Sequence, residues 1–136
     1  MAPPGKSRLP ADETAQLVVG LSANYTPGRA PGRFDWLYDG RGNWRPEVWQ
    51  RWIDLDPLTV VTRNPDAFDR TYPVYLDGAK FDEFGANIGA RKIHDVLKAR
   101  KNTVRFFESP GHHGDGMAER LEAGLRWTMS QLEAAK

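Results

Sequence analysis

Three short segments of the chain carry the apolar pattern that is typical of β-strands. Residues 16–22 form a continuous apolar run, as expected of a strand that is buried on both faces. Residues 72–77 and 103–108 are rich in β-branched and aromatic residues and are bounded by turn-forming residues. The pattern therefore predicts three strands.

Apolar residues at helical spacing predict three helices. Two long ones are expected over residues 86–101 and 117–133, where one face of each carries apolar side chains three or four positions apart. A short helix is expected to begin near Pro46, because proline suits the first helical position. Its apolar positions are Val48, Trp49, Trp52 and Ile53.

The order of these elements predicts an α/β fold with a three-stranded parallel βαβα sheet. The first strand is followed by a long irregular stretch at 24–70 that contains the short helix. Strand, helix, strand, a glycine-rich loop at 109–116 and a helix then alternate. Right-handed crossovers between neighbouring strands would place their helices on the same face of the sheet.

Length, charge and composition narrow the classes of protein to which this chain can belong. A chain of 136 residues fits one domain. Its net charge of +1, from 19 Lys and Arg against 18 Asp and Glu, argues against a nucleic-acid partner. The absence of cysteine excludes a disulfide scaffold, a thiol nucleophile and a cysteine-based metal site.

The beginning of the chain predicts neither a membrane span nor a signal peptide. No apolar run approaches the length that a bilayer requires, and the first ten residues lack an apolar segment. Residues 1–14, rich in proline and glycine, are expected to be a disordered lead-in to a domain at 15–136. A cytoplasmic location is the expectation.

The candidate chemistry lies in loops that follow the predicted strands, where open α/β sheets place their functional residues. Ser22, then the pair Asp82 and Glu83, then the pair His112 and His113 occur in the order Ser…Asp…His. This is the chain order of the α/β-hydrolase triad, in which the carboxylate orients an imidazole that serves the nucleophile.

The residues from Tyr75 to Trp127 resemble the C-terminal part of the esterase D-like branch of the α/β-hydrolases. The resemblance is carried by Asp82-Glu83-Phe84-Gly85 in a loop, Ile88-Gly89-Ala90-Arg91 and His94 in the following helix, and Glu108-Ser109-Pro110-Gly111-His112-His113 after the next strand. The cap-like excursion at 24–70 also looks like the family, so the resemblance covers most of residues 15–133. That segment holds Phe34-Asp35, Trp44, Trp49-Gln50-Arg51-Trp52 and Asp56-Pro57-Leu58.

This resemblance implies the C-terminal portion of an α/β-hydrolase sheet with a Trp-rich, cap-like excursion. It implies hydrolysis of a carboxylic ester through an acyl-serine intermediate, with no cofactor. Asp82 would be the triad acid and His113 the triad base.

Two departures from the family pattern matter. Gly111-His112-His113 stands where the family has Gly-Gly-His, so His112 is the alternative base; His113 is preferred because loop length varies more readily after the histidine. No Gly-x-Ser-x-Gly elbow occurs in the chain. The segment after Ser22 is unsuited to an elbow's helix, so Ser22 is not expected to be the nucleophile.

Structural roles are the alternatives for the same residues. Asp82 and Glu83 would also complement the N-terminus of the following helix. The two histidines, with His94 or Asp115, would offer few ligands to a metal. Trp49 and Trp52 would either pack their short helix onto the sheet or wall an acyl or alcohol pocket above the triad.

We therefore expect the C-terminal fragment of a serine carboxylesterase, inactive alone, with a small-molecule ester as the substrate of the full-length parent. The alternative is a non-enzymatic interaction module or a repurposed hydrolase remnant. The isolated chain is expected to self-associate, because strand 17–22 would present an open apolar edge and one sheet face would be uncovered.

Overall fold

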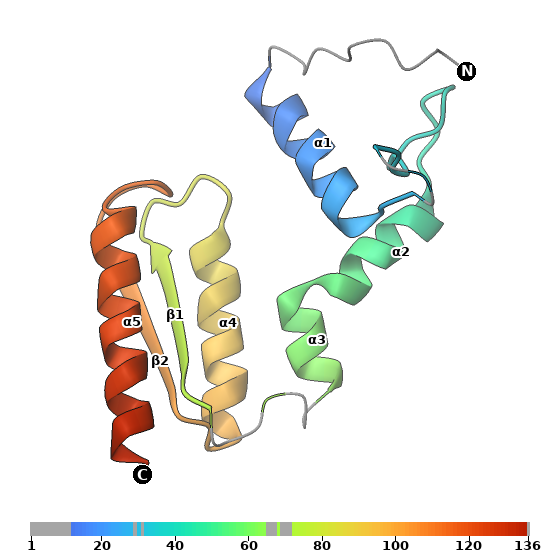
Figure 1. Ribbon diagram of the computed structural model, residues 1–136. Coiled ribbons are helices and arrows are strands. Elements are labelled where there is room, and N and C mark those ends of the chain that lie inside the picture. The colour runs from blue at the N-terminus through green and yellow to red at the C-terminus, as the bar shows by residue number, and fades with distance from the viewer. Residues whose placement is uncertain (1–11, 29, 31, 65–67, 69–71, 136) are drawn as a thin grey trace. The chain divides into compact units, whose positions relative to one another are not determined.

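The computed structural model describes residues 12–28, 30, 32–64, 68 and 72–135 (Figure 1). These residues form two compact units that divide after Asp56. The first unit contains α1 and α2. The second contains the other five elements. The bounds are α1 Glu13–Tyr25, α2 Pro46–Leu55, α3 Pro57–Arg63, β1 Val74–Ala79, α4 Ala86–Ala99, β2 Val104–Ser109 and α5 Met117–Ala134.

The predicted first strand is wrong, because residues 16–22 lie inside helix α1. The Asp12 side chain caps this helix by accepting a hydrogen bond of 2.8 Å from the Ala15 N–H. A short apolar run fits a buried strand and a helix equally well, and here an aspartate that satisfies a free N–H at the helix start favours the helix. Residues 1–11 of the expected lead-in lie outside the described residues.

Aromatic side chains hold the first unit together. The rings of Tyr25, Trp52, Trp49, Trp44 and Tyr38 follow one another, with neighbouring centroids 5.3 to 5.9 Å apart. Ring pairs at such distances add to the gain from burial. These rings pack on one another within the first unit, whereas packing of the short helix onto the sheet and a role in lining a substrate pocket stay predictions.

The second unit is built on a two-stranded parallel sheet, not the expected three-stranded one. β1 and β2 pair in register from Val74 opposite Val104 to Ala79 opposite Ser109. α4 connects the two strands as a crossover, as predicted, and α5 follows β2. The coarse prediction of a mixed α/β fold is thus confirmed, with strands and long helices close to their expected bounds.

The two long helices lie on opposite faces of the sheet, α4 on one and α5 on the other (Figure 1). Successive strand residues point to opposite faces. Gly78 approaches α4, where an added Cβ would lie 2.5 Å from the Asn87 Cα. Tyr75 instead packs against Gly124 of α5. The handedness rule applies to a helix between two parallel strands, and α5 is not such a helix among the described residues.

Helix α3 was not predicted from the sequence. Its interior Thr59, Val60, Val61 and Thr62 are β-branched, and such residues favour strands over helices. Packing overrides this preference, because Val61 is buried and its carbonyl accepts a 2.7 Å hydrogen bond from the Arg100 guanidinium. A contact between residues so far apart in the chain is a tertiary effect.

The described strands do not include the apolar edge on which self-association was argued. Residues 17–22 are helical, and each face of the two-stranded sheet carries one helix. Self-association stays a prediction, without its original physical basis.

Two helical glycines provide a matched test of how α5 packs. Replacing Gly124 with alanine would put a Cβ 2.8 Å from the Tyr75 ring, so we expect the free energy of unfolding to fall by about 1–3 kcal/mol. Replacing Gly89 of α4, where nothing lies within 4 Å of an added Cβ, should raise it by about 0.5–1 kcal/mol through helix propensity. Urea denaturation of both variants measures the two changes, and a stabilising Gly124→Ala would contradict the close contact.

Candidate active site

The two loops that carry the candidate acids and histidines leave the sheet at the same edge. Ala79 and Ser109, the last residues of the two strands, are partners in the parallel register. Backbone hydrogen bonds extend the pairing past the strand ends, from the Lys80 N–H to the Ser109 carbonyl at 2.8 Å and from the Phe81 N–H to the Gly111 carbonyl at 2.9 Å. Backbone hydrogen bonds therefore join the two loops directly before the candidate acids and histidines.

Asp82 and His113 form the expected contact. The Oδ2 atom of Asp82 lies 2.7 Å from the Nδ1 atom of His113. The Asp82 side chain is only 2% exposed, whereas that of His113 is 47% exposed. A shielded carboxylate thus holds a solvent-accessible imidazole, and the catalytic roles of both residues stay predictions.

The other carboxylate oxygen of Asp82 serves helix α4. Its Oδ1 accepts hydrogen bonds from the N–H groups of Phe84, at 2.9 Å, and Ala86, at 3.2 Å. The N-cap position is Gly85, which has no side chain to do this. The structural role considered for Asp82 is therefore present alongside the contact with His113.

Hydrogen bonding keeps Asp82 ionised. Burial raises the pKa of its carboxyl. Hydrogen bonds from His113, Ala86 and Phe84 together lower this pKa by more than burial raises it, so the net pKa is below the usual value. An ionised carboxylate only accepts, so a neutral His113 carries its proton on Nδ1. Its Nε2 lone pair is then available to take a proton.

A second acid–imidazole pair lies beside the first. The Nδ1 atom of His112 is 2.6 Å from Oε1 of Glu83. The Oε2 atom of the same carboxylate accepts the backbone N–H of His113 at 3.2 Å. Hydrogen bonds from the backbone of Glu83 itself and of His113, and then from the His112 ring, lower the pKa of Glu83. The pairing places His113 on Asp82 and His112 on Glu83.

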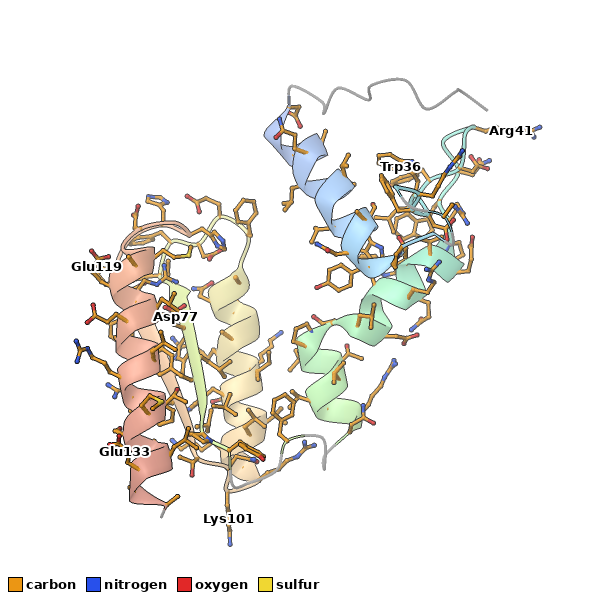
Figure 2. All side chains as sticks on the ribbon, viewed as in Figure 1. Trp36, Arg41, Asp77, Lys101, Glu119 and Glu133 are labelled. Carbon is orange, nitrogen blue, oxygen red and sulfur yellow. The ribbon has the colours of Figure 1, made fainter. Side chains whose placement is uncertain are left out.

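Arg120 of α5 anchors the histidine loop, and sequence reasoning missed it. Its guanidinium forms two hydrogen bonds with Asp77 of β1, Nε to Oδ2 at 2.7 Å and Nη2 to Oδ1 at 2.9 Å. Its Nη1 donates to the carbonyls of His113 and Asp115, each at 3.1 Å. Figure 2 shows the Asp77 side chain at β1 facing α5. The wide separation of Asp77 and Arg120 in the sequence offers no local signal of this pair.

Gly111 allows the histidine loop to turn sharply. Its φ of +103° lies in the region that favours glycine. An added Cβ would lie 2.6 Å from Oδ2 of Asp115, the atom that accepts the His112 N–H at 2.8 Å. Asp115 is therefore occupied in shaping the loop.

The remaining candidates lie outside this cluster. Ser22 is fully buried in α1, and its Oγ donates to the Val18 carbonyl at 2.7 Å. His94 lies in α4 with its ring 3.0 Å from the Asp95 carboxylate. Among the described residues, no group of three or more His, Cys, Asp or Glu side chains is placed to hold a metal ion.

Comparisons with protein-family models, with curated proteins and with solved structures found no match to this chain. No helix of the described residues is long and apolar enough to cross a bilayer.

Removing the Arg120 guanidinium should destabilise the second unit. In Arg120→Met the Asp77 carboxylate, whose side chain is 25% exposed, loses its partner, so we expect a loss of about 2–4 kcal/mol in the free energy of unfolding. Arg126→Met is the control on the same helix. It breaks an exposed pair with Glu122 and should cost less than about 0.5 kcal/mol. Equal losses in urea denaturation would show that Arg120 is not an anchor.

Asp82 should make folding sensitive to acid. Because its folded pKa is below the unfolded value, its ionised form stabilises the fold above about pH 4, and this contribution disappears as the pH falls through the folded pKa. The difference in unfolding free energy between the wild type and Asp82→Asn should therefore be smaller at about pH 3 than at about pH 5.5. Urea titrations at the two pH values measure it, and an unchanged difference would contradict the assigned ionisation.

Proposed function

We propose that this chain is the triad-acid and triad-base portion of a serine carboxylesterase-type α/β-hydrolase. The observation that carries the proposal is the 2.7 Å contact between the shielded Asp82 carboxylate and the half-exposed His113 ring. The location of both residues beyond the carboxyl ends of parallel strands supports it, because active sites of α/β proteins lie there. The resemblance of residues 75–127 to the esterase D-like branch adds to the argument.

In this function Asp82 orients His113 and stabilises its charged form, while His113 moves the proton. Neutral Nε2 takes the proton of the attacking hydroxyl as the hydroxyl oxygen bonds to the ester carbonyl carbon. Nε2 then returns the proton to the leaving alkoxide as the carbon–oxygen bond breaks. Water repeats the cycle on the acyl intermediate and releases the acid.

The nucleophilic serine of this scheme does not come from the 136 residues. They contain no Gly-x-Ser-x-Gly elbow. Ser22 is enclosed in α1 and its hydroxyl already donates to a carbonyl. The chain alone therefore has the acid–base pair and only residual reactivity toward an ester.

The exposed apolar face of α5 favours the second candidate, an interaction module. Met117, Leu121 and Leu125 are each more than half exposed. They lie along a groove of about 360 Å³ that is also lined by Tyr75 of β1. Apolar surface in such a continuous row marks a site where another protein surface packs.

Reactive esters test the esterase proposal against this alternative. We expect the purified chain to remain unlabelled by a fluorophosphonate probe, because Ser22 is inaccessible. We expect it to accelerate hydrolysis of p-nitrophenyl acetate slowly, through the imidazole of His113, with a rate that falls by roughly tenfold or more in His113→Gln. His94→Gln, which removes an imidazole of α4 that lies outside this cluster, is the matched control and should retain most of the rate.

Two outcomes would count against the proposal. Equal rates for the wild type and His113→Gln would remove His113 as the base and leave the interaction module as the better reading. Stoichiometric fluorophosphonate labelling of a serine in this chain would show that it carries its own nucleophile.

A further inference from the structure

The proposed mechanism uses Asp82 and His113 but assigns no role to Glu83 and His112. Glu83 follows Asp82 directly in the loop after β1, yet its carboxylate reaches the other loop at two points. It accepts the backbone N–H of His113 at 3.2 Å and contacts the His112 ring at 2.6 Å. One carboxylate thus contacts both histidines, the ring of His112 and the backbone of His113.

Both backbone polar groups of His113 are held by side chains. Glu83 accepts from its N–H, and Arg120 donates to its carbonyl. The loop itself contributes little stiffness, because Gly111, Gly114 and Gly116 interrupt it and glycine gives the backbone more freedom than any other residue. Because both backbone groups are hydrogen-bonded, the remaining freedom of His113 is mainly rotation about its side-chain bonds.

The contact with His112 determines where the Glu83 carboxylate points. Glu83 and His112 are both exposed, with side chains 52% and 62% accessible, so the pair contributes little stability by itself. Its geometric effect is larger. With Oε1 directed to His112, the second oxygen of the planar carboxylate faces the His113 N–H.

We propose that Glu83, oriented by His112, is a positioning residue that holds His113 against Asp82. The importance of this role for ester hydrolysis rests on the proposed function, whereas the geometric part does not. Glu83 touches no reacting atom. It acts by fixing the backbone from which the His113 ring reaches the Asp82 carboxylate.

Nuclear magnetic resonance of the ¹⁵N-labelled chain tests the geometric part. A hydrogen bond to a carboxylate protects the Nδ1–H of a histidine from exchange with water, so its signal becomes visible. We expect this signal of His113 in the wild type and its loss in Asp82→Asn. In Glu83→Ala it should broaden or vanish while the rest of the spectrum stays dispersed.

Glu83→Gln and Glu122→Ala are the comparison variants. The Gln side-chain oxygen can still accept the His113 N–H, so Glu83→Gln should restore most of the signal. A residue with only a general structural role would not show this rescue. Glu122 is exposed on α5, where its carboxylate pairs with Arg126, so Glu122→Ala should leave the signal unchanged.

The ester assay then separates this inference from the proposed function. In p-nitrophenyl acetate hydrolysis we expect a roughly fivefold fall for Glu83→Ala, as for loss of one ordinary hydrogen bond, with recovery in Glu83→Gln. An unchanged Nδ1–H signal in folded Glu83→Ala would overturn the positioning role, whatever the ester rates. If the signal is lost but His113→Gln reacts as fast as the wild type, the proposed function fails and the positioning role stands.

Discussion

The guanidinium of Arg120 joins three parts of the second unit through four hydrogen bonds. Two go to the Asp77 carboxylate within β1, and two go to carbonyls of the histidine loop. Only the planar, five-donor group of arginine supplies this set, since lysine offers a single nitrogen. The hydrogen-bonded Asp77 carboxylate stabilises the positive charge of Arg120 and raises the pKa of Arg120 above its usual value. Helix, strand and loop are therefore placed by one partly buried ion pair.

The candidate site depends on this anchor and on the parallel register of the sheet. The register brings the loops after β1 and β2 to the same edge. Within that cluster each oxygen of Asp82 has a separate task, since one accepts the N–H groups at the start of α4 and the other meets His113. The residue that caps α4 is thus also the carboxylate that contacts the His113 ring. This dual use means that a change at Asp82 affects both the helix and the imidazole.

Much of the second unit could be predicted from the sequence because its signals are local. Helical spacing in 86–101 and 117–133 located both long helices, and β-branched and aromatic residues bounded by turn-forming residues located both strands. The expected contact of Asp82 with His113 followed from general topology, because neighbouring parallel strands end at one edge. The strand predicted at 16–22 also rested only on a local pattern, and this prediction was wrong. That pattern fits two structures, and the cap at Asp12 decides between them.

The sequence by itself determined the mixed α/β class of the second unit and the order and approximate bounds of its strands and long helices. The sequence also determined that the candidate acids lie in the loop after β1 and the candidate histidines in the loop after β2. Only the tertiary structure decided that α5 covers the face opposite α4, that His113 and not His112 meets Asp82, and that Arg120 pairs with Asp77. The physical reason is range. Periodicity and caps act over a few residues, whereas these two pairings join positions 31 and 43 residues apart. The sequence around one partner therefore does not indicate which residue the other is.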